Sequence, residues 1–179
     1  MEKAIKLSEV QVGKTFFIAG IEFIKFNDEN GKTAAVSKDV LFKSDFGKNN
    51  NFAESSVLRK LEQEVLPKIA AEIGEENICE FETDLISLDG SKKHGKIRSK
   101  VSLPTFDFYR NNVEIFDKYK LDCWWWISTP DTTSDHLSDD WIVCVSPLGN
   151  IYDDFYRFNN YGVRPFCIFK SNIFVSCEE

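Results

Sequence analysis

The sequence predicts one α+β domain over residues 1–179, with a mostly antiparallel, twisted sheet and one main helix. Several short segments alternate apolar and polar residues with the period of a strand. A single stretch carries leucine, valine and isoleucine at helical spacing. The chain is 42% hydrophobic, which suffices for one core, and no linker, repeat or low-complexity tract divides it.

The first elements expected are the two strands of a β-hairpin. Residues Phe17–Phe26 alternate apolar and polar side chains around Gly20, which places Ile21, Phe23 and Lys25 on one face. The segment "NDENG" then favours a turn, because its glycine can adopt a positive φ. The segment "TAAVS" is expected to return as the second strand.

One main helix is expected over "NNNFAESSVLRKLEQEVLPKIAAEIG". Asn51 with Glu54, or Ser55 alone, suits its N-terminal cap. Pro67 lacks an N–H, so the helix should kink or restart there, and Gly74 should end it. The residues at helical spacing form one buried stripe: Leu58, Leu61, Val65 and Ile69.

A strand in "NICEFETDLISLDG" leads into the one basic run of this acidic chain. We interpret the surrounding residues 75–100 as a local elaboration of the fold. A solvated hairpin tip or loop is the plain interpretation of the basic run, and a contact with phosphate or an acidic partner is the alternative. Its five cationic residues are Lys92, Lys93, Lys96, Arg98 and Lys100.

After the basic run we expect a short helix and then several strands. A strand closes at Leu103 before Pro104, and Thr105 or Asp107 can cap the helix. Strands with alternating aromatic residues follow in "CWWWIST", "DDWIVCVSPLGNIYDD", "YGVRPFCIF" and "NIFVS". The segment "SPLGN" is a strong turn signal between two of them.

Three consecutive tryptophans lie in the first of these strands. Because neighbours in a strand point to opposite faces, Trp124 and Trp126 share one face and Trp125 takes the other. Burying one such ring contributes a few kcal/mol, from roughly 150–250 Å² at about 25 cal/mol per Å². We therefore expect two of the three tryptophans to lie in the core, and at least one of these to be Trp125 or Trp126. Trp124 could instead be partly exposed to a ligand or partner.

Arg164 lies within a strand, in the segment "GVRP", and needs hydrogen-bond acceptors because a buried, unpaired charge is prohibitive. The candidate acceptors are Asp or Glu side chains or the carbonyls around "STP". We interpret Arg164 as a structural lock, with a ligand clamp as the alternative. Pro165 implies an edge position or a bulge.

The segments "WWWISTP", "VCVSPLGNIYD" and "YGVRPFCIF" together resemble a domain of unknown function that is common in Gram-positive bacteria and their phages. "GIEFIKF", "SSVLRKLEQEVLPKI" and "VSLPTFDFY" are similar to its earlier segments, so the resemblance spans Gly20–Phe169. It implies a C-type-lectin-like fold, related to formylglycine-generating enzymes and phage receptor-binding proteins. The family's WWLRSP arginine is missing here. The residues carried over are Trp125, Trp126, Ser128, Pro130, Gly149, Gly162, Val163, Arg164 and Pro165, and no catalytic role comes with them.

The net charge of −7 disfavours direct binding to nucleic acid and permits binding to a basic protein groove. No apolar run reaches the roughly 18 residues of a membrane span, and no signal-peptide core is visible. We therefore expect a protein of the host-cell cytoplasm with no membrane contact. The five cysteines are widely spaced, so we expect free thiols, no metal and no cofactor.

Two polar segments are candidates for contacting a macromolecule. The loop "PDTTSDHLSDD" is acidic, and "YDDFYRFNNY" combines the aromatic, Arg and Asn side chains typical of recognition surfaces. A plain solvated loop and a Ca²⁺ site are the alternatives for the first. The candidate partner-binding residues are Asp131, Asp135, Asp139, Asp140, Asp153, Asp154, Tyr156 and Arg157.

We expect a non-catalytic binding module of phage or mobile-element origin with a protein partner. In its sharpest form it inhibits a host defence nuclease, in the anti-CRISPR manner, through its acidic loops. One alternative is a phage or cell-surface attachment protein that binds a receptor or carbohydrate. The other is a cryptic enzyme related to formylglycine-generating enzymes. Catalysis has little support, because His94 and His136 are the only histidines and no catalytic motif is present.

Overall fold

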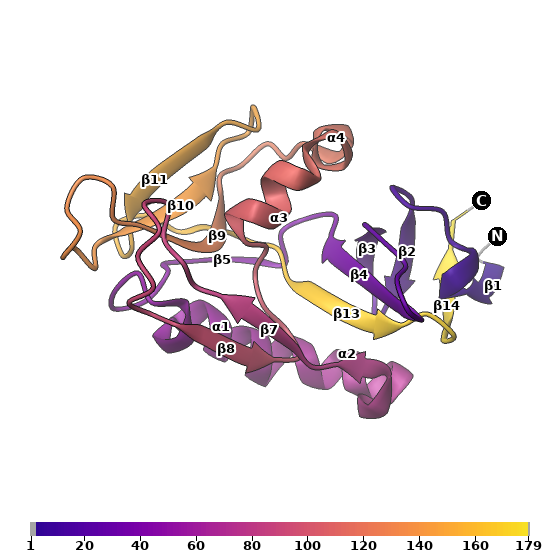
Figure 1. The fold of residues 1–179 in the computed structure, drawn as a ribbon. Helices are drawn as coiled ribbons and strands as arrows, with labels where there is room; N and C mark the ends of the chain where they lie inside the picture. The colour runs from indigo at the N-terminus through magenta and orange to yellow at the C-terminus, as the bar shows by residue number, and fades with distance from the viewer. Residues whose placement is uncertain (1–2, 179) are drawn as a thin grey trace.

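The structure is a computed structural model that describes residues 3–178. Its strands form a seven-stranded sheet, a five-stranded sheet and a separate two-stranded hairpin, with helices on opposite sides (Figure 1). This confirms the α+β class, the mostly antiparallel pairing and the one main helix. The strands divide between separate sheets, however, where a single sheet was expected.

The seven-stranded sheet has the order β1-β14-β2-β3-β4-β13-β6, and every pair in it is antiparallel. The two ends of the chain therefore pair with each other, through β1 and β14. The strands are β1 (Lys3–Lys6), β2 (Thr15–Ile18), β3 (Ile21–Lys25), β4 (Lys32–Ser37), β6 (Ile78–Cys79), β13 (Phe166–Lys170) and β14 (Phe174–Cys177).

The segment expected as one strand over Phe17–Phe26 contains a turn. Ala19 and Gly20 have φ values of 54° and 72° and connect β2 to β3, so that Phe16 lies opposite Phe23. The apolar run continues through this turn, which is why the alternation alone did not reveal it. The expected hairpin with the "NDENG" turn is confirmed as β3–β4.

The five-stranded sheet has the order β11-β10-β9-β12-β5. Its pairs are antiparallel except β9 and β12, which run parallel where Gly162 lies opposite Trp125. The strands are β5 (Phe42–Ser44), β9 (Trp125–Asp131), β10 (Trp141–Val145), β11 (Ile151–Phe155) and β12 (Tyr161–Val163). The separate hairpin consists of β7 (Phe81–Asp84) and β8 (Lys96–Ser99), and its tip and return strand carry the basic run.

The main helix runs without a break through α1 (Ser56–Lys60), a π-helical segment (Leu61–Val65) and α2 (Leu66–Ile73). Ser55 caps it by accepting a hydrogen bond from the Leu58 N–H at 3.0 Å, while Asn51 caps the short 3-10 helix before it. The π segment widens the helix just before Pro67, where an N–H is missing. Gly74 ends the helix at φ 84°.

Two short helices cover the other side of the five-stranded sheet: α3 (Phe106–Asn111) and α4 (Val113–Phe116). Thr105 caps α3 by accepting from the Phe108 N–H at 3.1 Å, which decides between the two caps expected from the sequence. In Figure 1 the sheets lie between α3–α4 above and α1–α2 below.

The tryptophans of β9 divide between two cores, as their alternation predicted. Trp126 is fully buried in the core that includes the main helix, and its Nε1 donates to the Ser44 carbonyl at 2.8 Å. Trp125 is buried in a second core beneath α3 and α4. Trp124 is half-buried and stacks on Tyr161, with 5.7 Å between the ring centroids. The triplet thus contributes side chains to the cores on both sides of β9.

Other residues carried over from the resemblance make hydrogen bonds around β9 through their backbone groups. Ser128 donates its N–H to the Pro104 carbonyl at 3.0 Å, and the Pro130 carbonyl accepts from Leu88 at 3.1 Å. The Gly149 carbonyl accepts from the Tyr109 hydroxyl at 2.7 Å. These contacts are structural.

At Gly162 two segments of the chain approach each other closely. Its N–H donates to the Trp124 carbonyl at 2.8 Å. A Cβ atom added at Gly162 would lie 2.2 Å from Val40 Cγ1, so only glycine fits here without a shift.

Arg164 is 1% exposed and lies where the chain crosses from the five-stranded to the seven-stranded sheet. Its guanidinium stacks on Trp125 and Phe116, and Nε donates to the Ser37 carbonyl at 2.9 Å. Both expected kinds of acceptor, an Asp or Glu side chain and a carbonyl near "STP", are therefore wrong: the acceptor is the Ser37 carbonyl in β4, and Nη2 has no partner among the described residues. Burial lowers the pKa of Arg164 to about 10, so it stays charged at neutral pH. Pro165 follows in this crossover, where a strand N–H is not needed.

Candidate functional site

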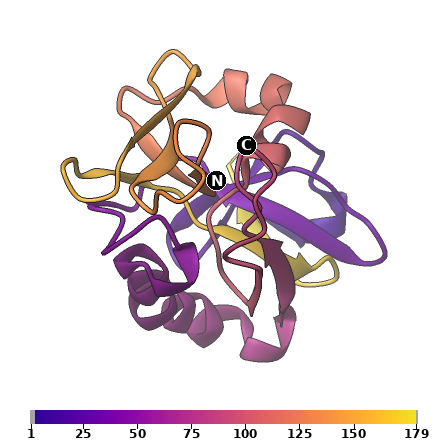
Figure 2. The same cartoon turned by 60° about the vertical axis from the view of Figure 1, so that its left-hand side comes forward.

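Three segments meet at one end of the five-stranded sheet, on the left in Figure 1 and brought forward in Figure 2. They are the hairpin tip 87–95, the acidic loop 132–140, and β11 with its following turn, 151–160. We call them together the loop surface. Asn50 ties it to the rest of the molecule: its N–H donates to the Asp139 carbonyl at 2.8 Å, and its side chain donates to the Trp141 carbonyl at 3.0 Å.

The aspartates around the acidic loop differ in their availability. Asp131 is buried at the end of β9 and accepts from the Thr133 N–H at 2.8 Å, so it cannot contact a partner as expected. Asp135 and Asp140 are exposed. The acidic face offered to a partner is therefore smaller than the sequence suggests.

The basic run and the acidic loop contact each other. Lys93 Nζ lies 2.7 Å from Asp139 Oδ1, across 46 residues of sequence. Three more cations of the run form ion pairs: Lys96 with Glu82 at 2.7 Å, Arg98 with Glu80 at 2.7 Å, and Lys100 with Glu75 at 3.0 Å. Lys92 has no ion pair with another described residue. The run is therefore largely neutralised within the molecule, although exposed ion pairs of this kind are weak because water and salt screen them.

Asp89, a residue the sequence did not single out, links the hairpin tip to the acidic loop. Its carboxylate accepts from the Ser87 hydroxyl, from Thr132 Oγ1 at 2.5 Å and from His136 Nδ1. Hydrogen bonds from Ser87, Thr132 and His136 hold the pKa of Asp89 well below its usual range. A local signal existed in "SLDG", an aspartate before a turn glycine, but its partner lies 47 residues away in the sequence.

This cluster does not form a catalytic triad. A triad needs the imidazole between hydroxyl and carboxylate, whereas the Asp89 carboxylate lies between Ser87 and His136. The other histidine, His94, contacts Asn50 Oδ1 at 2.8 Å, and burial lowers its pKa. Both imidazoles therefore make contacts that hold loops in place.

The second candidate segment, expected as a loop over residues 152–161, is half strand. Residues up to Phe155 belong to β11, an edge strand. Asp154 accepts from Asn159 Nδ2 at 2.7 Å, from the Tyr161 hydroxyl and from the Phe155 N–H at 2.7 Å. The Phe155 N–H points to the open edge, because the next N–H, of Tyr156, bonds across to Asp140. Asp154 therefore covers part of the open edge, which disfavours pairing with a further strand.

Asp153 remains exposed on β11. Burial raises its pKa, and the neighbouring carboxylates of Asp131 and Asp154 add to the rise. Its carboxylate therefore lies in a locally negative field, which favours a cationic partner group.

Aromatic rings form an exposed patch beside these acids. The Arg157 guanidinium lies over Phe155, Tyr156 and Phe158, 5.7 to 5.8 Å from each centroid. Phe158 is 70% exposed and stacks on Phe155. Four of the seven exposed large hydrophobic residues found among the described residues lie within residues 137–158: Leu137, Leu148, Tyr152 and Phe158. Much of the exposed apolar surface thus lies on β11 and on the connections before and after β10 and β11.

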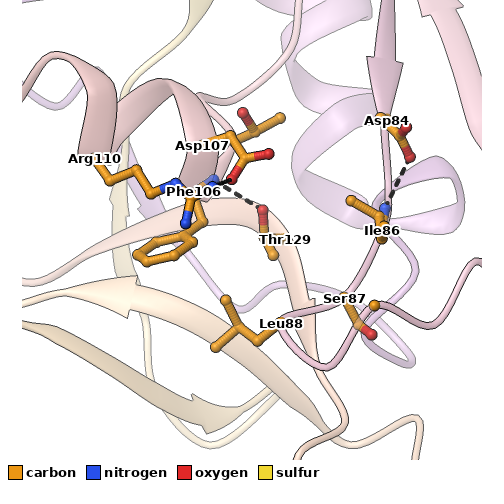
Figure 3. A pocket seen from close by; sticks show the side chains of 10 residues that line it. Asp84, Ile86, Ser87, Leu88, Phe106, Asp107, Arg110 and Thr129 are labelled. Atoms are coloured by element: carbon orange, nitrogen blue, oxygen red, sulfur yellow. Dashed lines mark hydrogen bonds and ion pairs between the residues drawn. The ribbon is translucent and has the colours of Figure 1, made fainter.

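A cavity of about 300 Å³ lies between α3 and the segment 84–90 (Figure 3). Its polar groups bond locally: Arg110 pairs with Asp107 at 3.0 Å, and the Phe106 N–H donates to Thr129 Oγ1 at 2.9 Å. No His or Cys side chain lines it. Among the lining hydroxyls, that of Ser87 donates to Asp89 and that of Thr129 accepts from the Phe106 N–H.

The cysteines give no support to thiol chemistry. Cys167 on β13 and Cys177 on β14 are separated by β4, β3 and β2 in the sheet, so they do not form an adjacent pair. Burial raises the pKa of both thiols and raises that of Cys144 to about 12. Within residues 3–178, no group of three or more His, Cys, Asp or Glu side chains could hold a metal ion.

Comparison with protein-family models, curated proteins and solved structures finds no match for this chain. Every helix of the described residues is too short or too polar to cross a membrane. The function is therefore inferred from the residues of the loop surface.

Proposed function

We propose that this protein is a non-catalytic binding module whose loop surface contacts a macromolecular partner with a basic surface. The observation that carries this is the exposed aromatic patch bordered by acids without ion partners. Asp135, Asp140 and Asp153 are exposed and form no ion pair with another described residue, and Tyr152 and Phe158 are exposed on the same loop surface.

The composition of the loop surface supports a protein contact. Interfaces combine aromatic and Arg side chains at the centre with a polar rim, and monomers rarely expose large contiguous apolar patches. Arg157 and the rings around it provide the centre, and the three aspartates provide an acidic rim. A partner that covered Phe158, which is 70% exposed, would remove its ring from water and so favour binding.

The internal bonds of the loop surface support the same proposal. Asn50, Asp89 and Lys93 fix the loops before a partner arrives, which lowers the entropy lost on binding. Two of these ties come from the hairpin tip, through Asp89 and Lys93, and the third comes from Asn50, before the main helix. A loop held in this way is suited to present its exposed carboxylates, those of Asp135 and Asp140, in a defined position.

In its sharpest form, the proposal makes this protein an inhibitor of a host defence nuclease, of the anti-CRISPR type and of phage origin, acting in the host cytoplasm. The net charge of −7 supports this, because nuclease channels for nucleic acid are basic. The C-type-lectin-like relationship belongs to the same proposal. An attachment protein for envelope receptors or carbohydrates is the alternative that the experiment separates.

The test is capture of binding proteins from a bacterial lysate with immobilised protein, at low and at high salt. The surface variant combines Asp135→Lys, Asp140→Lys and Phe158→Ala. The control variant makes the same charge change and a matched apolar truncation away from the loop surface: Glu62→Lys, Glu64→Lys and Val113→Ala. We expect a nuclease that is retained by wild type and control, lost with the surface variant and weakened by salt. Retention by all three proteins, or binding to envelope sugars alone, would contradict the inhibitor proposal.

A further inference from the structure

A second cavity, of about 580 Å³, lies far from the loop surface, where the β3–β4 turn meets the β13–β14 turn. In Figure 1 these two turns lie in the right-hand part of the molecule, near β1 and β14. Its lining residues are Lys6, Ser8, Asp28, Asn30, Gly31, Lys32, Cys79, Lys170, Ser171 and Asn172. Three of these ten are lysines, in a chain with 22 basic and 29 acidic residues.

The floor of this cavity is a fixed polar network. Lys25 is 2% exposed and donates to the Leu7 carbonyl at 2.9 Å and to Asp28 Oδ2 at 2.7 Å. The Ser171 hydroxyl donates to Asp28 Oδ1 at 2.8 Å and contacts the Thr33 hydroxyl at 2.9 Å. Both carboxylate oxygens of Asp28 are thus occupied. Asp28 is the one acid in the lining, and its charge is neutralised by Lys25. It therefore repels a bound anion only weakly.

The rim lysines have no acidic partner within residues 3–178. Lys6, Lys32 and Lys170 are exposed, and none forms an ion pair with another described residue. Lys32 and Lys170 lie directly opposite each other in the β4–β13 ladder. Like charges in this position destabilise a sheet. Glu29, in the neighbouring turn, meets Lys32 through two backbone hydrogen bonds, of 2.9 and 3.0 Å.

We propose that this cavity binds a small molecule with two or more phosphate groups. Lysine ammonium groups bind phosphate as point charges, and an anion between Lys32 and Lys170 removes their repulsion. Ser8, Asn30 and Asn172 offer further donors around the cavity. No aromatic side chain lines it, so the contacts are to phosphate rather than to a stacked base. The volume lies in the range of small-molecule sites.

This site is independent of the loop surface and of its partner. It uses the other sheet and different residues, and its cations oppose the acidic character of the loop surface. The plain alternative is three solvated lysines at turn ends with no ligand. Saturable binding that depends on these lysines distinguishes the two alternatives.

The experiment is calorimetric titration of the full chain with inorganic tripolyphosphate at low salt. We expect one saturable site per chain. Lys32→Gln and Lys170→Gln should each weaken binding about tenfold, the effect of losing one charged hydrogen bond. Lys48→Gln, an exposed lysine outside the cavity, is the matched control and should keep wild-type affinity. Without ligand, the Tm of Lys170→Gln should stay equal to wild type or rise, because the repulsion is gone.

Three results would overturn the proposal. One is the absence of saturable binding. The second is equal weakening by Lys48→Gln, which would indicate diffuse attraction to any lysine. The third is binding of a single-stranded oligonucleotide with no binding of tripolyphosphate, which would make the lysines a nucleic-acid contact.

Discussion

The guanidinium carbon of Arg164 lies 4.8 Å from the centroid of the Trp125 ring, and the two groups are buried together beneath α3 and α4. One residue lies at the crossover between the sheets, and the other on the central strand β9. This stacked pair therefore joins the seven-stranded sheet to the strand from which the acidic loop emerges.

Replacing Arg164 tests this pair. Arg164→Lys should lower the free energy of unfolding by about 3 kcal/mol, because a buried ammonium loses the planar stack and the Ser37 bond. Arg164→Met should cost less, about 1–2 kcal/mol, since it removes the charge and leaves one carbonyl without its donor. Urea denaturation of both variants measures the difference. A lysine variant as stable as wild type would show that the stack of Arg164 on Trp125 does not stabilise the fold.

Gly162→Ala should lower the free energy of unfolding by about 2 kcal/mol, because the new methyl group would overlap Val40. The double variant Gly162→Ala with Val40→Ala should recover part of this loss, since the smaller side chain makes room. A double-mutant cycle from denaturation curves gives the coupling energy. Strictly additive effects would mean that the contact with Val40 is not the reason for glycine here.

The Asp89 cluster should make the acidic loop sensitive to pH. The pKa of Asp89 is lowered in the folded protein, so its stabilising effect is complete above the ordinary carboxyl pKa of about 4 and is lost as the pH falls below it. Asp89→Asn should therefore lower the Tm at pH 7, and the difference from wild type should shrink below pH of about 4. Melting curves across this range measure it. Asp122→Asn is the control, and a difference that is constant with pH would contradict the role of the ionised carboxylate.

Local patterns predicted much of the fold. The alternation around Trp125 and Trp126 correctly placed them in different cores, and the Ser55 cap and Gly74 stop bound the main helix as expected. Each of these depends on neighbours within a few residues. The Ala19–Gly20 turn was missed because apolar residues continue on both sides of it.

The candidate site was less predictable, because its contacts join distant parts of the chain. The Lys93–Asp139 pair spans 46 residues, and nothing near either residue indicates the other. Asp131 looks like the other loop aspartates in sequence, but it is the last residue of β9 and its side chain is buried. The charge composition therefore correctly indicated that this surface is acidic. It overstated how many of the aspartates are exposed and without an ion pair.

The central claim is that a partner covers the loop surface. Hydrogen exchange of the protein alone and with the captured partner tests this most directly, because it reports protection along the chain. We expect new protection in residues 132–140 and 151–160, and none in the main helix over Ser56–Ile73. Protection confined to the main helix, with residues 132–140 and 151–160 unchanged, would contradict the account.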